Sequence, residues 1–271
     1  MFCKELNKEF ESKELMFAEL KANKSMIIDE KKATIKTSED NLLGFYNKKT
    51  GAIKGIPDMD DDFIYAVISN TNFIDSHKDV HMDGSMTKTA KEQNRKVYYV
   101  ADHELKVDNI IATPKNVEIV LIKLDWKDLG KEFEGKTEAF IFKIEKTKIV
   151  HKKFKQLIDS GESLQNSIRM QYLKIEMAVN SEDEELKEEY KTYLKVYPKI
   201  ANKEQIDKDG YFFAIMELKI ILEGSAVLFG SNDATPTKIR EAVNNDTSLD
   251  EPPKGTQQKS IHEMLSKVSL I

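Results

Sequence analysis

The stretch Val117-Glu-Ile-Val-Leu-Ile-Lys-Leu-Asp-Trp126, followed after a polar, glycine-bearing segment by Thr137-Glu-Ala-Phe-Ile-Phe-Lys-Ile-Glu145, decides the class of secondary structure. Successive side chains of a β-strand point to opposite faces, so alternate apolar residues gather on one face. The residues that share a face are Val120, Ile122, Leu124 and Trp126 in the first run and Phe140, Phe142 and Ile144 in the second. The sequence therefore predicts an antiparallel hairpin with an extended loop and a buried side.

Further strands and helices are predicted around this hairpin. Apolar runs at 63–69, 96–102, 164–175 and 211–229 have the length and composition of strands. Residues 150–160 carry apolar side chains at helical spacing, and Gly161 suits the left-handed position just past a helix end. Ser181-Glu-Asp-Glu184 has the spacing of a capping box and predicts an acidic helix that stops near Pro198.

Shifts in composition divide the chain into parts. Residues 1–40 are predicted as an N-terminal helical arm, an appendage or a partner-binding segment, and residues 41–240 as the main domain. Within that domain, residues 180–210 are predicted as a solvated insertion. Residues 241–271 are predicted as a flexible linker with a C-terminal amphipathic helix.

Composition excludes several classes of function. A chain of 271 residues with a net charge of −5 and interspersed lysines and acids lacks the basic stripe of a nucleic-acid-binding protein. No segment approaches the roughly 20 apolar residues of a membrane-spanning helix, and the start has no signal-peptide core. The lone Cys3 forms no internal disulfide. A soluble, intracellular protein is expected.

Three residues on strand-like runs carry the chemistry of a serine hydrolase. Ser167 shares a strand face with Arg169, a cation placed to support a developing oxyanion; the alternative interpretation is an ordinary solvated strand face. His103 ends an apolar strand and is the side chain that can serve as a base near neutral pH. Glu223 ends another apolar run, where a buried carboxylate needs a partner such as a histidine ring N–H. Ser163 and Ser225 remain alternative nucleophiles.

The segment Asp75-Ser-His-Lys-Asp-Val-His-Met-Asp-Gly84 offers a competing site. If it is extended, carboxylates and imidazoles alternate along one face and could hold a metal. Five ligands in one line cannot converge on a single ion unless the segment folds back. We therefore expect no metal there, and a metal-binding module is the weakest of the alternatives.

In chain order these segments resemble the prohead proteases of tailed bacteriophages, which are capsid-maturation serine proteases related to herpesvirus assemblins. That family has an Asp-rich segment before a helix, similar to the one at 75–86 here. Its catalytic histidine ends the next strand, as His103 does, and its nucleophile lies in a strand of the type seen at Ser167-Ile-Arg-Met170. A later strand of the family resembles Glu223-Gly-Ser-Ala-Val-Leu-Phe-Gly-Ser-Asn232.

The resemblance implies an α+β fold, a mostly antiparallel and partly closed β-barrel flanked by helices, as in herpesvirus proteases. It implies a serine endopeptidase in which Ser167 attacks, His103 moves the proton, Glu223 orients His103 and Arg169 supports the oxyanion, with no metal or organic cofactor. The implied partners are the major capsid protein and the scaffold protein, inside the assembling prohead in the host cytoplasm. A homodimer, and self-cleavage at 250–259, are also expected.

An alternative from another class is a non-enzymatic internal scaffold or structural virion protein with the same fold. Its terminal amphipathic helices would then bind partners, and no catalytic site would be needed.

Overall fold

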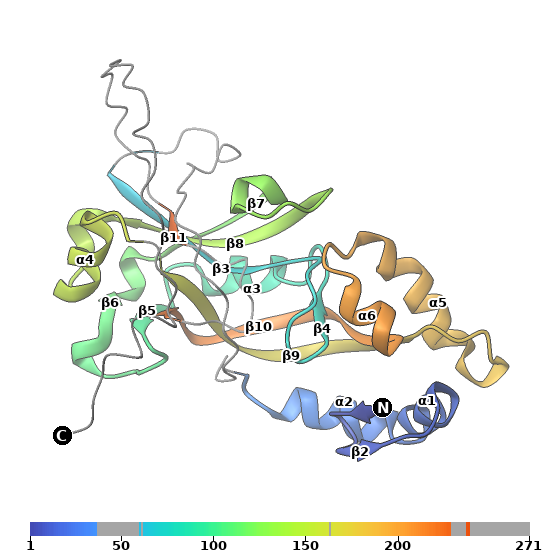
Figure 1. Ribbon diagram of the computed structural model, residues 1–271. Helices are drawn as coiled ribbons and strands as arrows, with labels where there is room; N and C mark the ends of the chain where they lie inside the picture. The colour runs from blue at the N-terminus through green and yellow to red at the C-terminus, as the bar shows by residue number, and fades with distance from the viewer. Residues whose placement is uncertain (37–59, 61, 163, 229–236, 239–271) are drawn as a thin grey trace, which may run out of the picture. The chain divides into compact units, whose positions relative to one another are not determined.

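The computed structural model describes residues 1–36, 60, 62–162, 164–228 and 237–238 (Figure 1). All of them belong to one compact unit, Met1–Glu241. The helices are α1 Lys13–Ala22, α2 Lys24–Ala33, α3 Thr87–Gln93, α4 Lys152–Asp159, α5 Lys187–Val196 and α6 Glu204–Asp209. The strands are β1 Phe2–Cys3, β2 Lys8–Glu9, β3 Phe63–Asn70, β4 Asp79–His81, β5 Tyr98–Ala101, β6 Ile110–Ala112, β7 Glu118–Asp125, β8 Lys136–Glu145, β9 Gln165–Val179, β10 Tyr211–Val227 and β11 Thr237–Lys238. Short 3-10 helices are η1 Val107–Asn109, η2 Pro114–Asn116, η3 Trp126–Leu129, η4 Lys146–Lys148, η5 Glu184–Leu186 and η6 Tyr197–Lys199.

The described strands form separate sheets. In the larger sheet β10 pairs with β4, β5 and β9, and β5 pairs with β6; the smaller sheet has the order β11-β3-β8-β7, and β1 pairs with β2. Among the described strands, the pairs of β10 with β4 and β5 are parallel and the others are antiparallel. The expected α+β class and mostly antiparallel pairing are therefore confirmed. Within the described residues no sheet closes into a barrel, because β7 and β11 end the smaller sheet without pairing to the larger one.

The predicted hairpin is confirmed in both pairing and faces. β7 and β8 pair antiparallel from Glu118 opposite Lys143 to Asp125 opposite Lys136. The face that holds Leu124 and Trp126 is buried in one apolar cluster. The β8 face formed by Phe140, Phe142 and Ile144 is buried in a second, larger cluster. β8 is therefore a central strand with a core on each side.

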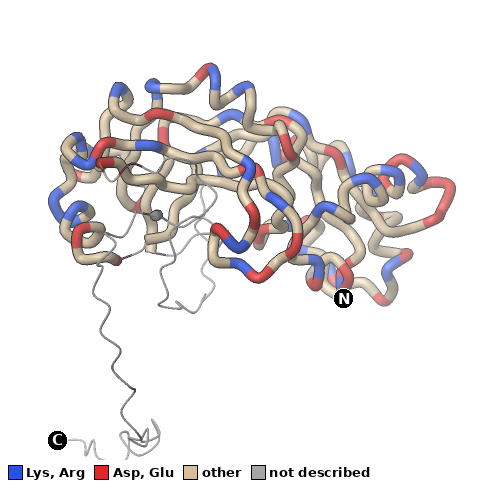
Figure 2. Tube along the Cα trace, turned by 90° about the horizontal axis from the view of Figure 1, so that it is seen from above, with Lys and Arg blue, Asp and Glu red and all other residues tan. Residues whose placement is uncertain are grey.

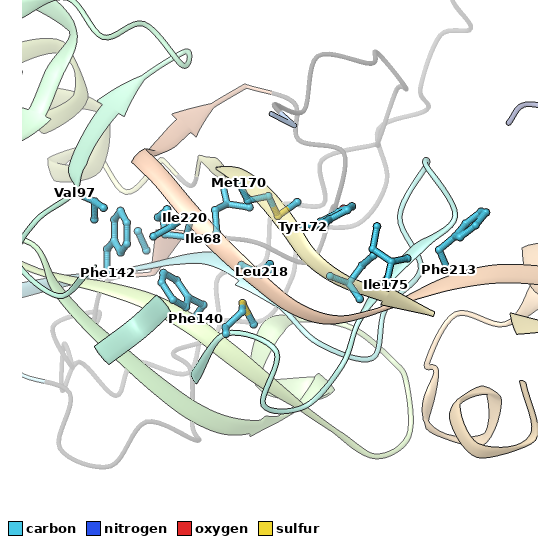
Figure 3. Packing of buried hydrophobic residues seen from close by; sticks show 14 of the residues in the cluster. Ile68, Val97, Phe140, Phe142, Met170, Tyr172, Ile175, Phe213, Leu218 and Ile220 are labelled. Atoms are coloured by element: carbon cyan, nitrogen blue, oxygen red, sulfur yellow. The ribbon is translucent and has the colours of Figure 1, made fainter. Parts of the chain in front are cut away.

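The main core lies between the larger and smaller sheets. Figure 3 shows Met170 and Tyr172 of β9 and Ile220 of β10 in the same cluster as Phe140 and Phe142 of β8. Such burial stabilises a domain by about 25 cal/mol for each Å² of apolar surface removed from water. The two long strands β9 and β10 thus present one face to this core, and their opposite face is left for other side chains.

Gly224 lets β10 approach the smaller sheet closely. A Cβ at this position would lie 2.7 Å from Cε2 of Phe142 and 2.9 Å from Cγ2 of Ile68. Because Gly224 faces the core, its neighbours Glu223 and Ser225 face the other side of the sheet.

The N-terminal helices pack onto the body of the protein. Met16, Phe17 and Leu20 of α1 and Ile27 of α2 are buried in the main cluster. Beyond α2, Lys36 forms an antiparallel bridge with Met170 of β9. The described residues 1–36 of the predicted N-terminal arm are therefore a packed part of the unit. The reason is that their apolar side chains are buried in the main cluster.

The segment between β9 and β10 is helical, and it too packs onto the sheet. α5 begins after the acidic stretch that predicted it and ends at Val196, ahead of Pro198. Tyr193 and Val196 are buried against Phe212 of β10 in a third cluster. The predicted helix is confirmed, but the segment is less solvated than expected because one face of α5 is apolar.

Charged side chains of both signs are interspersed along the described chain, as Figure 2 shows. Among the helices that the structure describes, none combines the length and the apolar character that a bilayer crossing requires. The expectations for the linker and helix at 241–271, including the cleavage segment at 250–259, fall outside the described residues.

Candidate functional site

His103 follows β5 in a sharp left-handed turn. Asp102 and His103 have φ angles of 54° and 57°, a conformation uncommon for residues other than glycine. The Asp102 N–H donates to the Ala226 carbonyl at 2.9 Å, and the His103 N–H donates to Ser225 Oγ at 2.8 Å. These two bonds fold the chain back so that the imidazole lies over β10.

The imidazole meets Glu223 on the face of β10 that points away from the core. His103 Nδ1 lies 2.9 Å from Glu223 Oε1, and the Glu223 side chain is 0% exposed. A carboxylate only accepts hydrogen bonds, so Nδ1 is the donor in this contact. In the neutral form of the ring this tautomer makes Nε2 the basic nitrogen.

A bulge in β10 aims Glu223 at His103. The pairing with β9 shifts between Ile220 and Gly224, and Leu222 within the bulge has a φ angle of 65°. Bulges re-aim side chains and are common next to active sites. A leucine in the left-handed region costs roughly 1 kcal/mol or more. Left-handed residues therefore lie at both ends of the contact: Leu222 beside Glu223, and Asp102 together with His103 itself.

Ser167 shares the face that holds Glu223 and Ser225. It pairs directly with Ser225 in the antiparallel ladder between β9 and β10, so the two side chains project from the same face. Ser167 is 5% exposed. The alternative interpretation of a solvated strand face is therefore wrong. Ser225 links Ser167 to the turn of His103, because its Oγ binds the His103 N–H.

Arg169 lies two residues beyond Ser167 on the same face of β9. Its Nε is 3.6 Å from Glu223 Oε1, and its side chain is partly exposed. The buried Nε of Arg169 and Oε2 of Glu223 have no hydrogen-bond partner within the described part of the chain. The structure thus brings His103, Glu223 and Arg169 together around one carboxylate, beside the strand pair that holds Ser167.

Of the two alternative nucleophiles, Ser225 and Ser163, only Ser225 lies within the described residues. The hydroxyl of Ser225 is fully buried; it accepts from His103 N–H and donates to the Val100 carbonyl at 3.2 Å. Ser225 therefore braces the turn, a role that no spacing in the sequence revealed. Ser163 falls outside the described residues.

The Asp75–Asp83 region is organised by ion pairs and hydrogen bonds. Asp79 is fully buried and pairs with Lys31 at 2.6 Å and Lys36 at 2.8 Å. Burial works to raise the pKa of Asp79, but the two ammonium groups hold it below its ordinary value. Within the described residues, no group of three or more His, Cys, Asp or Glu side chains could hold a metal ion. Lysines thus occupy the place that a cation would take at Asp79.

His81 and Asp75 are the buried titratable neighbours of this ion pair. His81 Nδ1 lies 3.0 Å from Ser69 Oγ, and burial lowers the pKa of His81 to about 4. Asp75 Oδ1 accepts from the backbone N–H groups of His77 and Asp79. Burial and the Asp79 carboxylate nevertheless raise the pKa of Asp75 to about 7.

His81 and Asp75 have opposite effects on the way the free energy of unfolding changes with pH. Between about pH 4 and 6.5 the unfolded state binds a proton at His81 that the native state does not, so stability rises with pH. Between about pH 4 and 7 the native state keeps a proton at Asp75 that the unfolded state releases, so stability falls with pH. Each effect is on the order of 3 kcal/mol, and the two largely cancel in the wild-type protein.

Single substitutions should separate the two effects. We expect Asp75→Asn, which keeps the acceptor oxygen, to become more stable as pH rises from 4 to 6.5. We expect His81→Asn to become less stable as pH rises from 4 to 7. Urea unfolding at half-unit pH steps measures both slopes. Unchanged slopes in both variants would rule out this assignment of the protons.

Comparison of the chain with protein-family models, with curated proteins and with solved structures gave no significant match.

Proposed function

We propose that this protein is a serine endopeptidase of capsid maturation in a tailed bacteriophage. The observation that carries the proposal is the hydrogen bond between the buried Glu223 and His103 Nδ1, formed on the strand face that also bears Ser167. A carboxylate that fixes a histidine tautomer near a serine is the arrangement by which hydrolases activate a hydroxyl.

In the proposed mechanism Ser167 Oγ attacks the carbonyl carbon of a peptide bond and its proton passes to His103 Nε2. Glu223 accepts from Nδ1–H throughout and stabilises the imidazolium ion that forms. Collapse of the tetrahedral intermediate breaks the C–N bond, and the imidazolium gives its proton to the leaving amine. A water molecule, activated by the same nitrogen, then cleaves the acyl-enzyme and restores Ser167.

The remaining elements of the proposal follow from the resemblance to prohead proteases. They are a herpesvirus-protease-like fold, cleavage of the scaffold or of the capsid protein's N-terminal extension, self-cleavage at 250–259, a homodimer and a location inside the prohead in the host cytoplasm. The α+β architecture and the order His, Ser, acid along the chain support them. The resemblance also gives Arg169 the role of supporting the oxyanion.

Co-expression with the major capsid protein and the scaffold protein of the same genome tests the function. We expect intact-mass spectrometry to show defined truncation of a partner with the wild-type protein and none with Ser167→Ala, because the attacking hydroxyl is gone. A fluorophosphonate probe should add one adduct to the wild-type protein and none to the variant. Ser181→Ala, at a partly exposed serine before α5, is the matched control and should behave as wild type.

Equal truncation with the wild-type protein and Ser167→Ala would overturn the assignment of the nucleophile. Intact partners that still assemble normally with Ser167→Ala and with the wild-type protein would instead favour the structural virion protein.

A further inference from the structure

Arg169 is held toward Glu223, and this contact constrains its role. The atom of the guanidinium closest to the acid is Nε, 3.6 Å from the same Oε1 that binds His103 Nδ1. One carboxylate oxygen therefore lies between an imidazole and a guanidinium. The side chain of Glu223 is 0% exposed, while that of Arg169 is 29% exposed.

A buried carboxylate requires a positive partner, and two are within reach at this site. An unpaired charge in the protein interior costs several kcal/mol. If His103 supplied the charge, it would be protonated at neutral pH and unable to act as a base. The guanidinium of Arg169 is always charged. It can therefore satisfy Glu223 and leave the imidazole neutral.

We propose that Arg169 is a positioning residue that acts through Glu223: its guanidinium balances the buried carboxylate so that His103 remains neutral and can act as a base. The kinetic consequence of this inference rests on the proposed function, whereas the charge balance among Arg169, Glu223 and His103 does not. It replaces the earlier expectation that Arg169 contacts the oxyanion directly.

Other charged groups lie along the loop of His103. They are Asp102, Glu104 and Lys106 on the loop itself, and Lys106 pairs with Glu104. In the described strands, the charged groups that meet at this site are Glu223 on β10 and Arg169 on β9. Of these two, Arg169 is the cation, so its removal should raise the affinity of His103 for a proton.

The two possible roles of Arg169 predict different results for Arg169→Met. As a positioning residue, its loss should move the protonation midpoint of His103 up by about one pH unit. The acid limb of kcat/KM should move with it, while the plateau at high pH falls by less than about tenfold. As an oxyanion donor, its loss should lower kcat by about 10²–10³-fold with an unchanged pH profile.

The experiment is an NMR titration of the imidazole resonances together with a pH profile of kcat/KM on a peptide from the mapped cleavage site. The His103 resonance is assigned by its loss in His103→Gln. Arg169→Lys restores a cation and should return the midpoint close to that of the wild-type protein. Arg95→Met removes the exposed arginine that pairs with Glu118 and should leave the midpoint unchanged.

The NMR measurement keeps this inference separate from the proposed function. A midpoint that rises in Arg169→Met and returns in Arg169→Lys supports the inference even if no peptide is cleaved. In that case only the proposed protease function is rejected. A midpoint that does not move in Arg169→Met overturns the inference, whatever the activity. If Arg169→Met does not fold, Arg169→Gln is titrated in its place, with the same two outcomes.

Discussion

Glu223→Gln is expected to lower kcat/KM by about 10³–10⁴-fold while the protein remains folded. The amide matches the carboxylate in shape but has no charge to stabilise the imidazolium. It can also turn its NH₂ toward Nδ1 of His103, which would place the proton on Nε2 and remove the base. The 2.9 Å contact between His103 and Glu223 would persist with its polarity reversed. Steady-state kinetics on the mapped cleavage peptide measure the effect.

The protein contains a matched control for this substitution. Glu189 of α5 is also 0% exposed, and it binds Lys21 at 2.8 Å together with Lys24. We expect Glu189→Gln to lower the free energy of unfolding by a few kcal/mol, about 3 at most, because two lysines lose their counter-ion. It should leave kcat/KM within about twofold. Similar loss of activity in both variants would show that Glu223 serves only to stabilise the fold.

Asp79→Ala is expected to cost about 3–5 kcal/mol of stability, the largest effect of any single substitution considered. It leaves Lys31 and Lys36, with side chains only 10% and 14% exposed, without their shared counter-ion. Removing one partner of a buried ion pair lowers stability much more than replacing both partners with apolar side chains does. Urea unfolding gives the free energy. Hydrogen exchange at Met170, whose N–H donates to the Lys36 carbonyl at 3.2 Å, shows whether the bridge to β9 is released.

A triple variant tests the physical reason for this loss. If unpaired lysine charge is the cause, Asp79→Ala with Lys31→Met and Lys36→Met should recover most of the stability, because apolar side chains of similar length carry no desolvation cost. If stability is not recovered, Asp79 contributes to it through its position in β4 and not through its pairing with the two lysines. The ion-pair explanation would then fail.

Local patterns in the sequence predicted the features that depend on near neighbours. Alternation gave the faces of β7 and β8, and the segment after Ser181 gave α5 with its end before Pro198. The predicted cap at Ser181 is not formed, because Asp183 caps the 3-10 helix that precedes α5. The cost of burying an acid at the end of an apolar run predicted that Glu223 needs a partner, and the resemblance to prohead proteases named His103 as that partner. Apart from that resemblance, these predictions need only a strand period, a helix period or a solvation cost.

Other features depend on contacts between distant segments, which no local pattern encodes. Lys24 is 165 residues from Glu189, and Lys31 is 48 residues from Asp79. The sequence therefore suggested an N-terminal helical arm, an appendage or a partner-binding segment, where the structure has packed helices. The bulge at Leu222 and the left-handed turn at His103 were also missed, because neither is marked by glycine. Tertiary contacts hold these residues in conformations that their own preferences disfavour.

The place of β10 in the chain has a consequence for biosynthesis. This strand pairs with β4, β5 and β9, all of which precede it, and it carries Glu223 and Ser225. A nascent chain that has not yet released β10 from the ribosome lacks both the acid and the brace for His103. Such long-range pairing also makes folding slow. Hydrolytic chemistry of the proposed kind at this site would therefore require nearly all of Met1–Glu241 to have been synthesised and folded.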